Sequence, residues 1–362
     1  MPLLTSLLVA ASISSAQAKV VSPEVHPDRT VTFRFKGAKA EAVSLYLEGQ
    51  GNQKMEKSAD GVWSITTKAL APDYYGYSFN VDGNTTIDPL NSRVTPNLFY
   101  AGNQVLVAGN PAELWEIQDV PRGNVTRHYY KSAYVGDYRD FLVYTPPGYS
   151  AKSSNLPVLY LLHGYSDTAI AWTEVGKAHV ILDNLLAQKK IKPMVVVMPL
   201  GYGIKDFANP NVPATIYGLN NFPKFKEALL TEVMPQVESS YKVSKKKSDR
   251  AICGLSMGGA ESLFVGLNHL EKFNYIGAFS SGGFPTPNPE DSIKGLSADK
   301  AKELKILWMV CGRQDGLIGF QRGFSDWLKT KGMNVETKET EGGHVWQLWR
   351  RNLAEFAQRL FK

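Results

Sequence analysis

The distribution of hydrophobic and polar positions divides the chain into two parts. In the first part, hydrophobic and polar residues alternate with a period of two at 30–35, 42–47, 62–67 and 74–81. Gly, Asn, Asp and Pro residues lie between these runs and mark turns. Short alternating strands at this spacing are typical of an antiparallel sandwich. We therefore expect residues 19–109 to form a small all-β domain.

The second part, residues 125–362, has continuous apolar runs in place of alternating ones. Strands that are buried on both faces have this pattern, and segments with a helical period lie between them. The pattern predicts an α/β domain with a mostly parallel central sheet, preceded by a hairpin around Gly136 and a linker at 110–124. Pro235 predicts a kink in one helix. The predicted strands are 157–162, 194–198, 250–253, 275–280, 304–311 and 334–339, and the predicted helices are 175–188, 225–241, 259–270, 320–331 and 346–361.

Residues 1–18 differ from the rest of the chain. They are apolar and small, and Ala16-Gln17-Ala18 fits the A-x-A cleavage pattern, although no Lys or Arg precedes the apolar run. This composition predicts a secretory signal peptide, so we expect a secreted or periplasmic protein. No later stretch approaches the ~20 apolar residues of a membrane span, so we expect no membrane partner.

Composition and charge exclude several classes of function. The net charge is +6, but the basic residues are scattered and the densest run is only 245–247, so we expect no nucleic-acid partner. The chain has no H-E-x-x-H motif, no paired-cysteine motif, no acidic cluster with hard-ion spacing and no phosphate-binding or dinucleotide-binding loop. We therefore expect neither a metal site nor a cofactor.

The two cysteines, Cys253 and Cys311, each end a predicted buried strand. The strand at 275–280 falls between them in sequence. If strand order follows sequence, two strand steps of ~4.8 Å separate them, about 10 Å in all. That distance is too long for a disulfide, so we predict two small buried thiols.

The main candidate for a catalytic residue is the serine of a G-x-S-x-G motif. This motif is Gly254-Leu255-Ser256-Met257-Gly258, and it lies between a predicted strand and a predicted helix. In this motif the serine lies on a sharp, strained turn that exposes its hydroxyl at the sheet edge. The motif alone also fits an ordinary glycine-rich turn. A serine hydroxyl is a weak nucleophile, so the assignment requires a base within hydrogen-bond reach.

His344 and Asp315 are the partners that Ser256 requires. His344 lies in a glycine-rich loop after the last predicted strand, and Asp315 follows the strand at 304–311. Both therefore lie at the carboxyl edge of the predicted sheet, and the chain order Ser–Asp–His is that of α/β-hydrolases. Asp315 could instead only cap its turn. The competing acids are Glu290, Asp291 and Asp326.

Backbone N–H groups are expected to stabilise the oxyanion. We assign these donors to Met257, directly after the serine, and to Tyr165, in the loop after the strand at 157–162. His163 is expected to hold that loop through a side-chain hydrogen bond. Trp172 and Trp346 are the candidate substrate-binding residues, because aromatic walls suit a flat acyl group.

Taken together, these motifs resemble those of the esterase D / feruloyl esterase group of α/β-hydrolases. The first part of the chain resembles, more weakly, the immunoglobulin-like modules of the glycogen-binding type that precede such esterases, at 21–25 and 89–91. The matching stretches of the second part are 136–139, 144–149, 161–164, 182–185, 197–199, 254–259, 311–312 with Asp315, and 343–346.

The resemblance implies a serine esterase with a Ser256, Asp315 and His344 triad. It also implies that the substrate is a feruloylated or acetylated plant cell-wall polysaccharide or oligosaccharide, with ferulate on arabinoxylan first. Acetylxylan esterases and enterochelin-type siderophore esterases belong to the same group. Two other hypotheses remain open, namely an acyltransferase that uses the same triad and a carbohydrate-binding protein with a vestigial hydrolase domain. The sequence does not give the oligomeric state.

Overall fold

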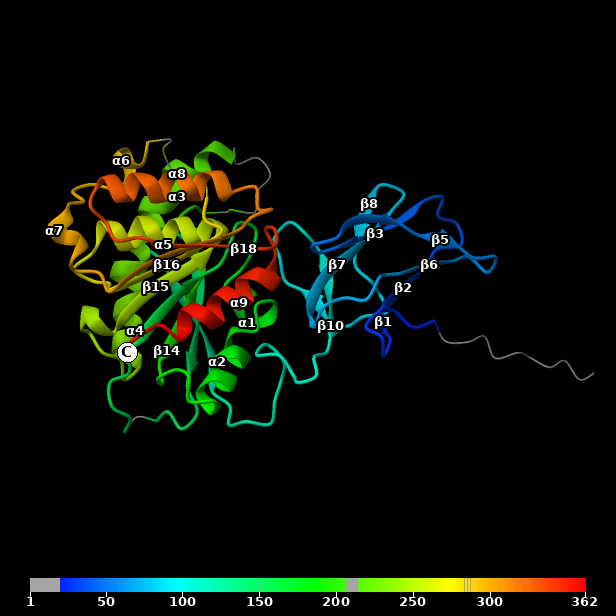
Figure 1. Cartoon of the computed structure of the whole chain (residues 1–362), viewed down its shortest axis with the longest axis horizontal. Helices are drawn as coiled ribbons and strands as arrows, with labels where there is room; N and C mark the ends of the chain where they lie inside the picture. Colours follow the sequence, from blue (N-terminus) through cyan, green and yellow to red (C-terminus); the bar gives the residue numbers. More distant parts are fainter. Residues whose placement is uncertain are drawn as a thin grey trace, which may run out of the picture.

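The computed structural model describes residues 20–362, except 151, 206, 208–213, 283, 285 and 287. It has a smaller domain of antiparallel sheets and a larger α/β domain, which lie side by side (Figure 1). The predicted signal peptide at 1–18 lies outside the described residues and stays a prediction. No helix in the described part of the chain is both long enough and apolar enough to cross a bilayer.

The N-terminal domain has two antiparallel sheets around one hydrophobic core. Alternating side chains of both sheets, such as Phe33, Leu45 and Phe79, are fully buried in this core, as the period-two pattern predicts. The first sheet has the order β1 (Glu24–Val25), β2 (Val31–Lys36), β6 (Val62–Thr66), β5 (Glu56–Lys57). The second has the order β4 (Gly51–Lys54), β3 (Val43–Leu47), β7 (Asp73–Val81), β10 (Gly102–Val107), β9 (Val94–Thr95), and β8 (Asn84–Thr86) pairs with β7.

The larger domain is built on an eight-stranded sheet. The hairpin β11–β12 and strand β14 pair antiparallel at one edge, and the remaining neighbours pair parallel. This arrangement confirms the predicted α/β class and the hairpin around Gly136. The strand order is β11 (Asn124–Lys131), β12 (Tyr138–Thr145), β14 (Val195–Pro199), β13 (Val158–Leu162), β15 (Arg250–Leu255), β16 (Tyr275–Phe279), β17 (Ile306–Gly312), β18 (Glu336–Thr340).

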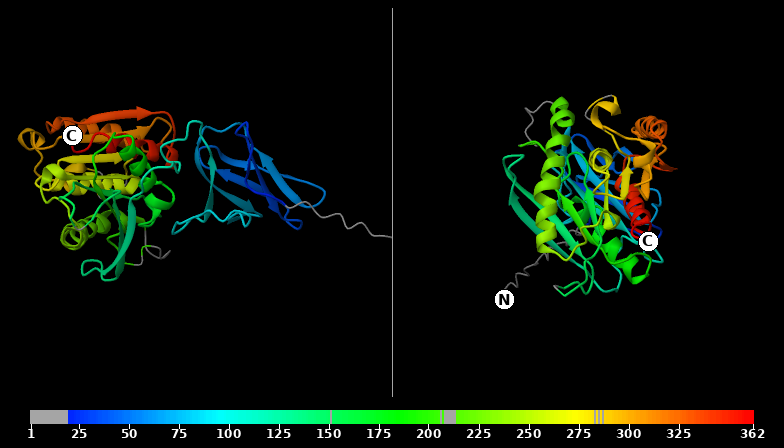
Figure 2. Two further views of the ribbon diagram at one scale, coloured as in Figure 1. Left: turned by 90° about the horizontal axis from the view of Figure 1, so that it is seen from below. Right: turned by 90° about the vertical axis from the view of Figure 1, so that its left-hand side faces the viewer.

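Helices cover both faces of this sheet (Figure 2). Apolar side chains of α3, α5 and α8 pack on one face, and those of α1, α2 and α9 pack on the other. Because both faces are covered, strands β13, β14, β15 and β16 are buried at every position. The helices are α1 (Ala171–Glu174), α2 (Ala178–Ala187), α3 (Ala214–Ala228), α4 (Met234–Ser240), α5 (Ser256–Asn268), α6 (Pro289–Ser292), α7 (Ala298–Ala301), α8 (Ile318–Thr330) and α9 (Trp346–Ala357).

The helix predicted at 225–241 differs in its start and in how it accommodates Pro235. It begins at Ala214, and a π-helical turn at Leu229–Val233 separates α3 from α4. Pro235 has no N–H and its ring clashes with the carbonyl four residues earlier, so it is tolerated in the first turn of α4 after this wider turn. The predicted kink is therefore a π-helical insertion.

Cys253 and Cys311 lie on β15 and β17, with β16 between them. Both thiols are free and buried, which confirms the prediction from strand spacing. Burial raises the pKa of both thiols, so neither is activated as a nucleophile.

The segment predicted as a linker packs tightly on the α/β domain. Trp115 is buried in the hydrophobic core beneath α2 and α9. The Asn184 side chain donates to the carbonyl groups of Leu114 and Glu116, both at 2.8 Å. The segment thus attaches the N-terminal domain rigidly, because its polar backbone groups are satisfied by the larger domain.

Trp115→Ala is expected to destabilise the protein by about 3 kcal/mol, the usual cost of removing a buried aromatic side chain. Ile117→Ala is the matched control, because Ile117 is 76% exposed only two residues away. Urea unfolding of both variants measures the difference. An equal effect of the two substitutions would contradict the rigid packing of this segment.

Candidate active site

Ser256 lies on the sharp turn between β15 and α5. Its φ is +52°, a conformation that costs energy for a residue with a side chain. A Cβ on Gly254 would lie 2.5 Å from the Gly258 carbonyl oxygen, and a Cβ on Gly258 would lie 2.4 Å from the His163 carbonyl oxygen. Both glycines are therefore required by close backbone approach, as the motif predicts.

The structure brings Ser256, His344 and Asp315 together. The His344 Nε2 atom lies 3.0 Å from Ser256 Oγ, and His344 Nδ1 lies 2.9 Å from Asp315 Oδ2. The three residues follow β15, β17 and β18 at the carboxyl edge of the sheet. The His344 side chain is 38% exposed and the Asp315 side chain is fully buried, so the imidazole is open to a substrate while its acid is shielded.

Two loops that carry the acid and the base are bonded to each other. The Arg313 N–H donates to the Thr340 carbonyl at 2.8 Å, and the Gly342 N–H donates to the Gln314 side chain at 2.7 Å. Arg313 also forms an ion pair with Glu341 at 2.5 Å. These bonds fix the separation of Asp315 and His344.

Burial alone would raise the pKa of Asp315. The hydrogen bonds from His344 and from the Leu317 N–H outweigh that effect, so the pKa of Asp315 lies below its ordinary value. The carboxylate is therefore ionised at neutral pH and holds the imidazole with its proton on Nδ1. In this tautomer Nε2 is an acceptor and faces the serine hydroxyl.

The loop after β13 lies against Ser256. A Cβ on Gly164 would lie 3.5 Å from Ser256 Cβ. His163 Nδ1 donates to the Gly164 carbonyl at 2.8 Å, and its Nε2 accepts from the Gly201 N–H at 2.8 Å. Burial lowers the pKa of His163 to about 4, so the ring is neutral in this arrangement. The side chain therefore holds the loop, as predicted.

The geometry of this loop orients Tyr165. In a trans peptide the C=O and N–H point in opposite directions, so fixing the Gly164 carbonyl against buried His163 turns the Tyr165 N–H away from it. Met257 is the second residue of α5, and the first four N–H groups of a helix have no partner within the helix. Both backbone donors thus belong to segments that adjoin Ser256, and their role in holding an oxyanion stays a prediction.

A pocket of about 750 Å³ opens over Ser256 and His344, between the two domains. A role of the N-terminal domain in shaping the rim of the site was one open alternative, but none of its residues was among the predicted site residues. The alternation at 42–47 places Tyr46 on the outer face of its strand, which could have indicated a surface role for this aromatic residue. Nothing in the sequence around Glu48 indicated a role in the site. The lining residues of the N-terminal domain include Tyr46, Glu48, Asn52, Ser78, Asn80, Thr85, Thr95, Asn97 and Tyr100, and those of the larger domain include Tyr165, Asp167, Val175, Leu255, Trp346 and Trp349.

The three tryptophans near the site have different roles. Trp346 lines the pocket, as predicted. The prediction for Trp172 is wrong, because its side chain is fully buried, donates to the Leu162 carbonyl at 2.9 Å and packs behind Trp346. Trp349 is buried but also lines the pocket, and it packs edge-on against the His344 ring with 4.8 Å between the ring centres.

The N-terminal domain also holds the loop after β13. The Asn97 side chain donates to Ser166 Oγ at 3.0 Å and to Asp167 Oδ1 at 3.2 Å. Phe99 stacks on Tyr165 with a ring separation of 5.7 Å. The loop that contains a predicted oxyanion donor is thus fixed from the neighbouring domain.

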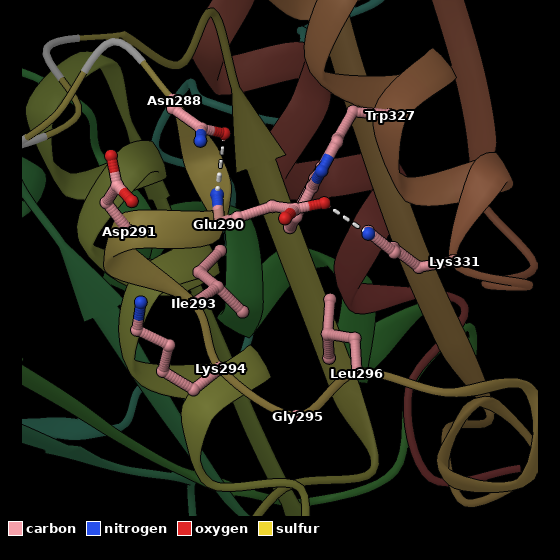
Figure 3. Close-up of a pocket in the computed structure, with 9 residues that line it drawn as sticks. All are labelled: Asn288, Glu290, Asp291, Ile293, Lys294, Gly295, Leu296, Trp327 and Lys331. Carbon is pink, nitrogen blue, oxygen red and sulfur yellow. Dashed lines mark hydrogen bonds and ion pairs between the residues drawn. The ribbon is translucent and has the colours of Figure 1, made fainter.

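The competing acids do not contact His344. Asp326 pairs with Lys329, and Glu290 and Asp291 line a separate hollow of about 320 Å³ (Figure 3). In Figure 3 the Glu290 carboxylate faces Lys331 across this hollow. Its nine lining residues include no serine, cysteine or histidine, so the hollow cannot hold a second serine–histidine pair.

No group of three His, Cys, Asp or Glu side chains in the described ranges is arranged to hold a metal ion.

The chain is similar in sequence to known esterases. The family model "Esterase", described as "Putative esterase", matches residues 132–360. The endo-1,4-beta-xylanase/feruloyl esterase of Xylanibacter ruminicola is 31% identical over 349 residues, which cover 94% of this chain. The match spans 46% of that relative's length.

Two solved structures are similar in fold. A ferulic acid esterase from Anaeromyces mucronatus, solved in complex with ferulic acid, has a TM-score of 0.58 and 25% identity and covers 71% of this chain and 98% of its own. The enterochelin esterase of Shigella flexneri has a TM-score of 0.69 at 19% identity and covers 92% of each chain. The second likeness therefore extends over both domains, but it is one of fold alone.

Asp167 gives a prediction for the dependence of stability on pH. Burial raises the pKa of Asp167 to about 7, against the opposing hydrogen bonds from Gly164 and Asn97. The folded protein therefore retains a proton that the unfolded chain, with an ordinary pKa near 3.8, has lost. The contribution of this residue to stability is complete below about pH 4 and is lost as the pH rises to about 7, at about 1.4 kcal/mol per pH unit at most.

Asp167→Asn, which does not ionise, is expected to gain in Tm relative to the wild type between pH 5 and pH 8. Asp299→Asn is the control, because its carboxylate lies 92% exposed on α7. Thermal unfolding of the three proteins across this range tests the prediction. A constant difference between wild type and Asp167→Asn would contradict it.

Proposed function

The chain belongs to the Esterase family, whose model covers residues 132–360, and from that membership we propose that it is a carboxylic ester hydrolase with Ser256 as nucleophile. The observation that carries the proposal is the hydrogen-bonded series from Ser256 through His344 to Asp315. A serine beside an imidazole that a buried carboxylate orients is the arrangement that acyl transfer to serine requires.

Acylation follows from this geometry. His344 Nε2 takes the hydroxyl proton of Ser256 as Oγ attacks the ester carbonyl carbon. The N–H groups of Met257 and Tyr165 stabilise the negative oxygen of the tetrahedral intermediate. Asp315 stabilises the imidazolium that forms. The carbon–oxygen bond to the alcohol then breaks, and His344 returns its proton to the departing alcohol oxygen.

Deacylation repeats these steps with water. His344 takes a proton from a water molecule, whose oxygen attacks the acyl-serine carbonyl. The second tetrahedral intermediate releases the carboxylic acid, and the proton on His344 returns to Ser256 Oγ. The pocket is open to solvent through the exposed face of His344, which admits the water.

We propose ferulate as the acyl group. The support is the name of the relative at 31% identity and the ferulic acid bound in the structure at 25% identity. Next to Ser256 the pocket has the aromatic side chains of Tyr165 and Trp346 and the apolar side chain of Leu255. Flat aromatic and apolar walls favour a planar aromatic acyl group over a small one such as acetate.

We propose a neutral glycan as the alcohol. The pocket continues from the triad onto the outer face of the second β-sheet, where hydroxyl, amide and tyrosine side chains lie. Its acidic lining residues are Glu48 and Asp167, and no Lys or Arg is among the described residues that line it. An uncharged sugar fits this surface better than an anionic iron–catecholate complex, so a siderophore ester is disfavoured. The export predicted from residues 1–18 is part of the same proposal, because a polysaccharide lies outside the cell.

We propose that the N-terminal domain is immunoglobulin-like, because it consists of two antiparallel sheets. The triad geometry disfavours a vestigial hydrolase domain. Transfer of the acyl group to a sugar in place of water uses the same residues, so the choice between hydrolysis and transfer depends on the products.

Ser256→Ala is expected to lower kcat on methyl ferulate about a million-fold, as nucleophile loss does in other triads. Ser239→Ala, on α4, is the control and is expected to keep wild-type turnover. Rates on methyl ferulate, acetylated xylan and enterobactin, with product analysis in the presence of a sugar acceptor, define the substrate and the acceptor. Unchanged turnover in Ser256→Ala would refute the assignment.

Tyr46→Ala is expected to raise KM for a feruloylated xylo-oligosaccharide three- to tenfold, which corresponds to about 1 kcal/mol of lost sugar contact. KM for methyl ferulate should not change, because methanol does not reach the sheet face. Tyr138→Ala, 78% exposed on the larger domain, is the control. An equal change with both substrates would show that Tyr46 does not contact the alcohol part.

A further inference from the structure

Glu48 connects the two domains through both oxygens of one carboxylate. It follows β3 in the N-terminal domain and is buried. Its Oε2 atom accepts from the Gly76 N–H of its own sheet at 3.0 Å. Its Oε1 atom accepts from the Trp346 N–H of the larger domain at 2.7 Å, across 298 residues of sequence.

The group that Glu48 binds is the N-terminus of helix α9. Trp346 is the first residue of α9, so its N–H has no acceptor within the helix. The preceding residue, Val345, has no side-chain oxygen and makes no side-chain cap. Glu48 therefore supplies from another domain the cap that the local sequence lacks. Its carboxylate also lies at the positive end of the helix dipole.

The first turn of α9 in turn determines the position of His344. His344 precedes Trp346 by two residues, and the Val345 N–H donates to the Gly343 carbonyl at 3.1 Å. The His344 ring packs edge-on against Trp349, which lies in that first turn. A displacement of the turn would move both the backbone and the packing surface of the imidazole.

A second set of contacts holds α9 at Arg350, directly after its first turn. Arg350, fully buried on α9, donates from Nε to Asp73 Oδ1 at 2.9 Å and from Nη2 to the Tyr74 carbonyl at 2.5 Å. Both acceptors belong to β7 of the N-terminal domain. In Figure 1 the N-terminal end of α9, in red, points toward this domain. The position of α9 along its axis is thus set from outside the α/β domain.

We propose that Glu48 is a positioning residue for His344, so that the N-terminal domain takes part in catalysis by holding the base at hydrogen-bond distance from Ser256. Glu48 does not touch the reacting atoms and acts through helix α9. The inference rests on the proposed triad. The proposed role differs from that of residues that only join the domains, because Glu48 binds the first turn of α9 directly.

The test compares Glu48→Met, Glu48→Gln and Gln104→Ala in the full chain. Methionine fills a similar volume without accepting the Trp346 N–H, whereas the glutamine oxygen accepts from one of the two N–H groups. Gln104→Ala is the matched control. Gln104 pairs with Gly76 in the same sheet and joins the domains through a 3.3 Å bond to the Val175 carbonyl, which Arg350 of α9 also reaches, but this bond does not involve the first turn of α9.

We expect Glu48→Met to lower kcat on methyl ferulate about a hundredfold, the order of loss that a 1 Å misplacement causes, with KM changed less than twofold. Glu48→Gln should recover part of the loss, three- to tenfold below wild type. Gln104→Ala should lower Tm but keep kcat within twofold of wild type. A structural role alone would lower Tm in all three variants and leave kcat unchanged in each folded protein.

Wild-type kcat in folded Glu48→Met would overturn the inference. If Glu48→Met does not fold, Glu48→Gln decides: a drop in kcat of at least threefold at constant KM supports the inference, and wild-type kcat overturns it. Ser256→Ala is measured alongside. Full activity in Ser256→Ala would refute the proposed triad itself, whereas an inactive Ser256→Ala with a fully active Glu48→Met would refute only the role of Glu48.

Discussion

The buried ion pair between Asp73 and Arg350 determines how the two domains meet. Removing two charges from water is costly, and attraction offsets the cost only where the remaining donors and acceptors are satisfied. Here Arg350 also donates to the carbonyl groups of Tyr74 and Val175, and Arg351 reaches the second oxygen of Asp73. Such a directional set of bonds permits one docking geometry. The pocket over Ser256 exists only in that geometry, because both domains line it.

The parts of the site differ in what holds them. Ser256 is fixed by covalent geometry at the end of a fully buried strand, where close backbone contacts leave the turn no alternative. His344 lies on a loop, and its position depends on Asp315, on Trp349 and on the N-terminal domain. Local structure therefore positions the nucleophile, whereas contacts with distant segments position the base.

The sequence was informative where the physical constraint is local. Continuous apolar strands predicted the parallel sheet, and the place of Asp315 and His344 after strand ends predicted that they meet Ser256. Prediction failed where the deciding partner is remote. Trp172 was assigned to the pocket as an aromatic wall for a flat acyl group, but Trp346, 174 positions further along the sequence, packs against it and it is fully buried. Glu48 was not predicted, because the sequence around it does not show that its carboxylate caps a helix of the other domain. Pro235 marked an irregularity correctly, but not its π-helical form.

The distance in sequence between Asp73 and Arg350 has a consequence for biosynthesis. Their side chains are 277 positions apart, and domains generally fold in the order in which the ribosome releases them. During synthesis Asp73 and Glu48 therefore have partners only within the N-terminal domain, such as the N–H groups of Tyr74 and Gly76, until α9 has emerged. Docking of α9 then completes the core of the larger domain, dehydrates both carboxylates and closes the pocket in a single late event. A nascent chain that already contains Ser256 is thus still without its assembled pocket.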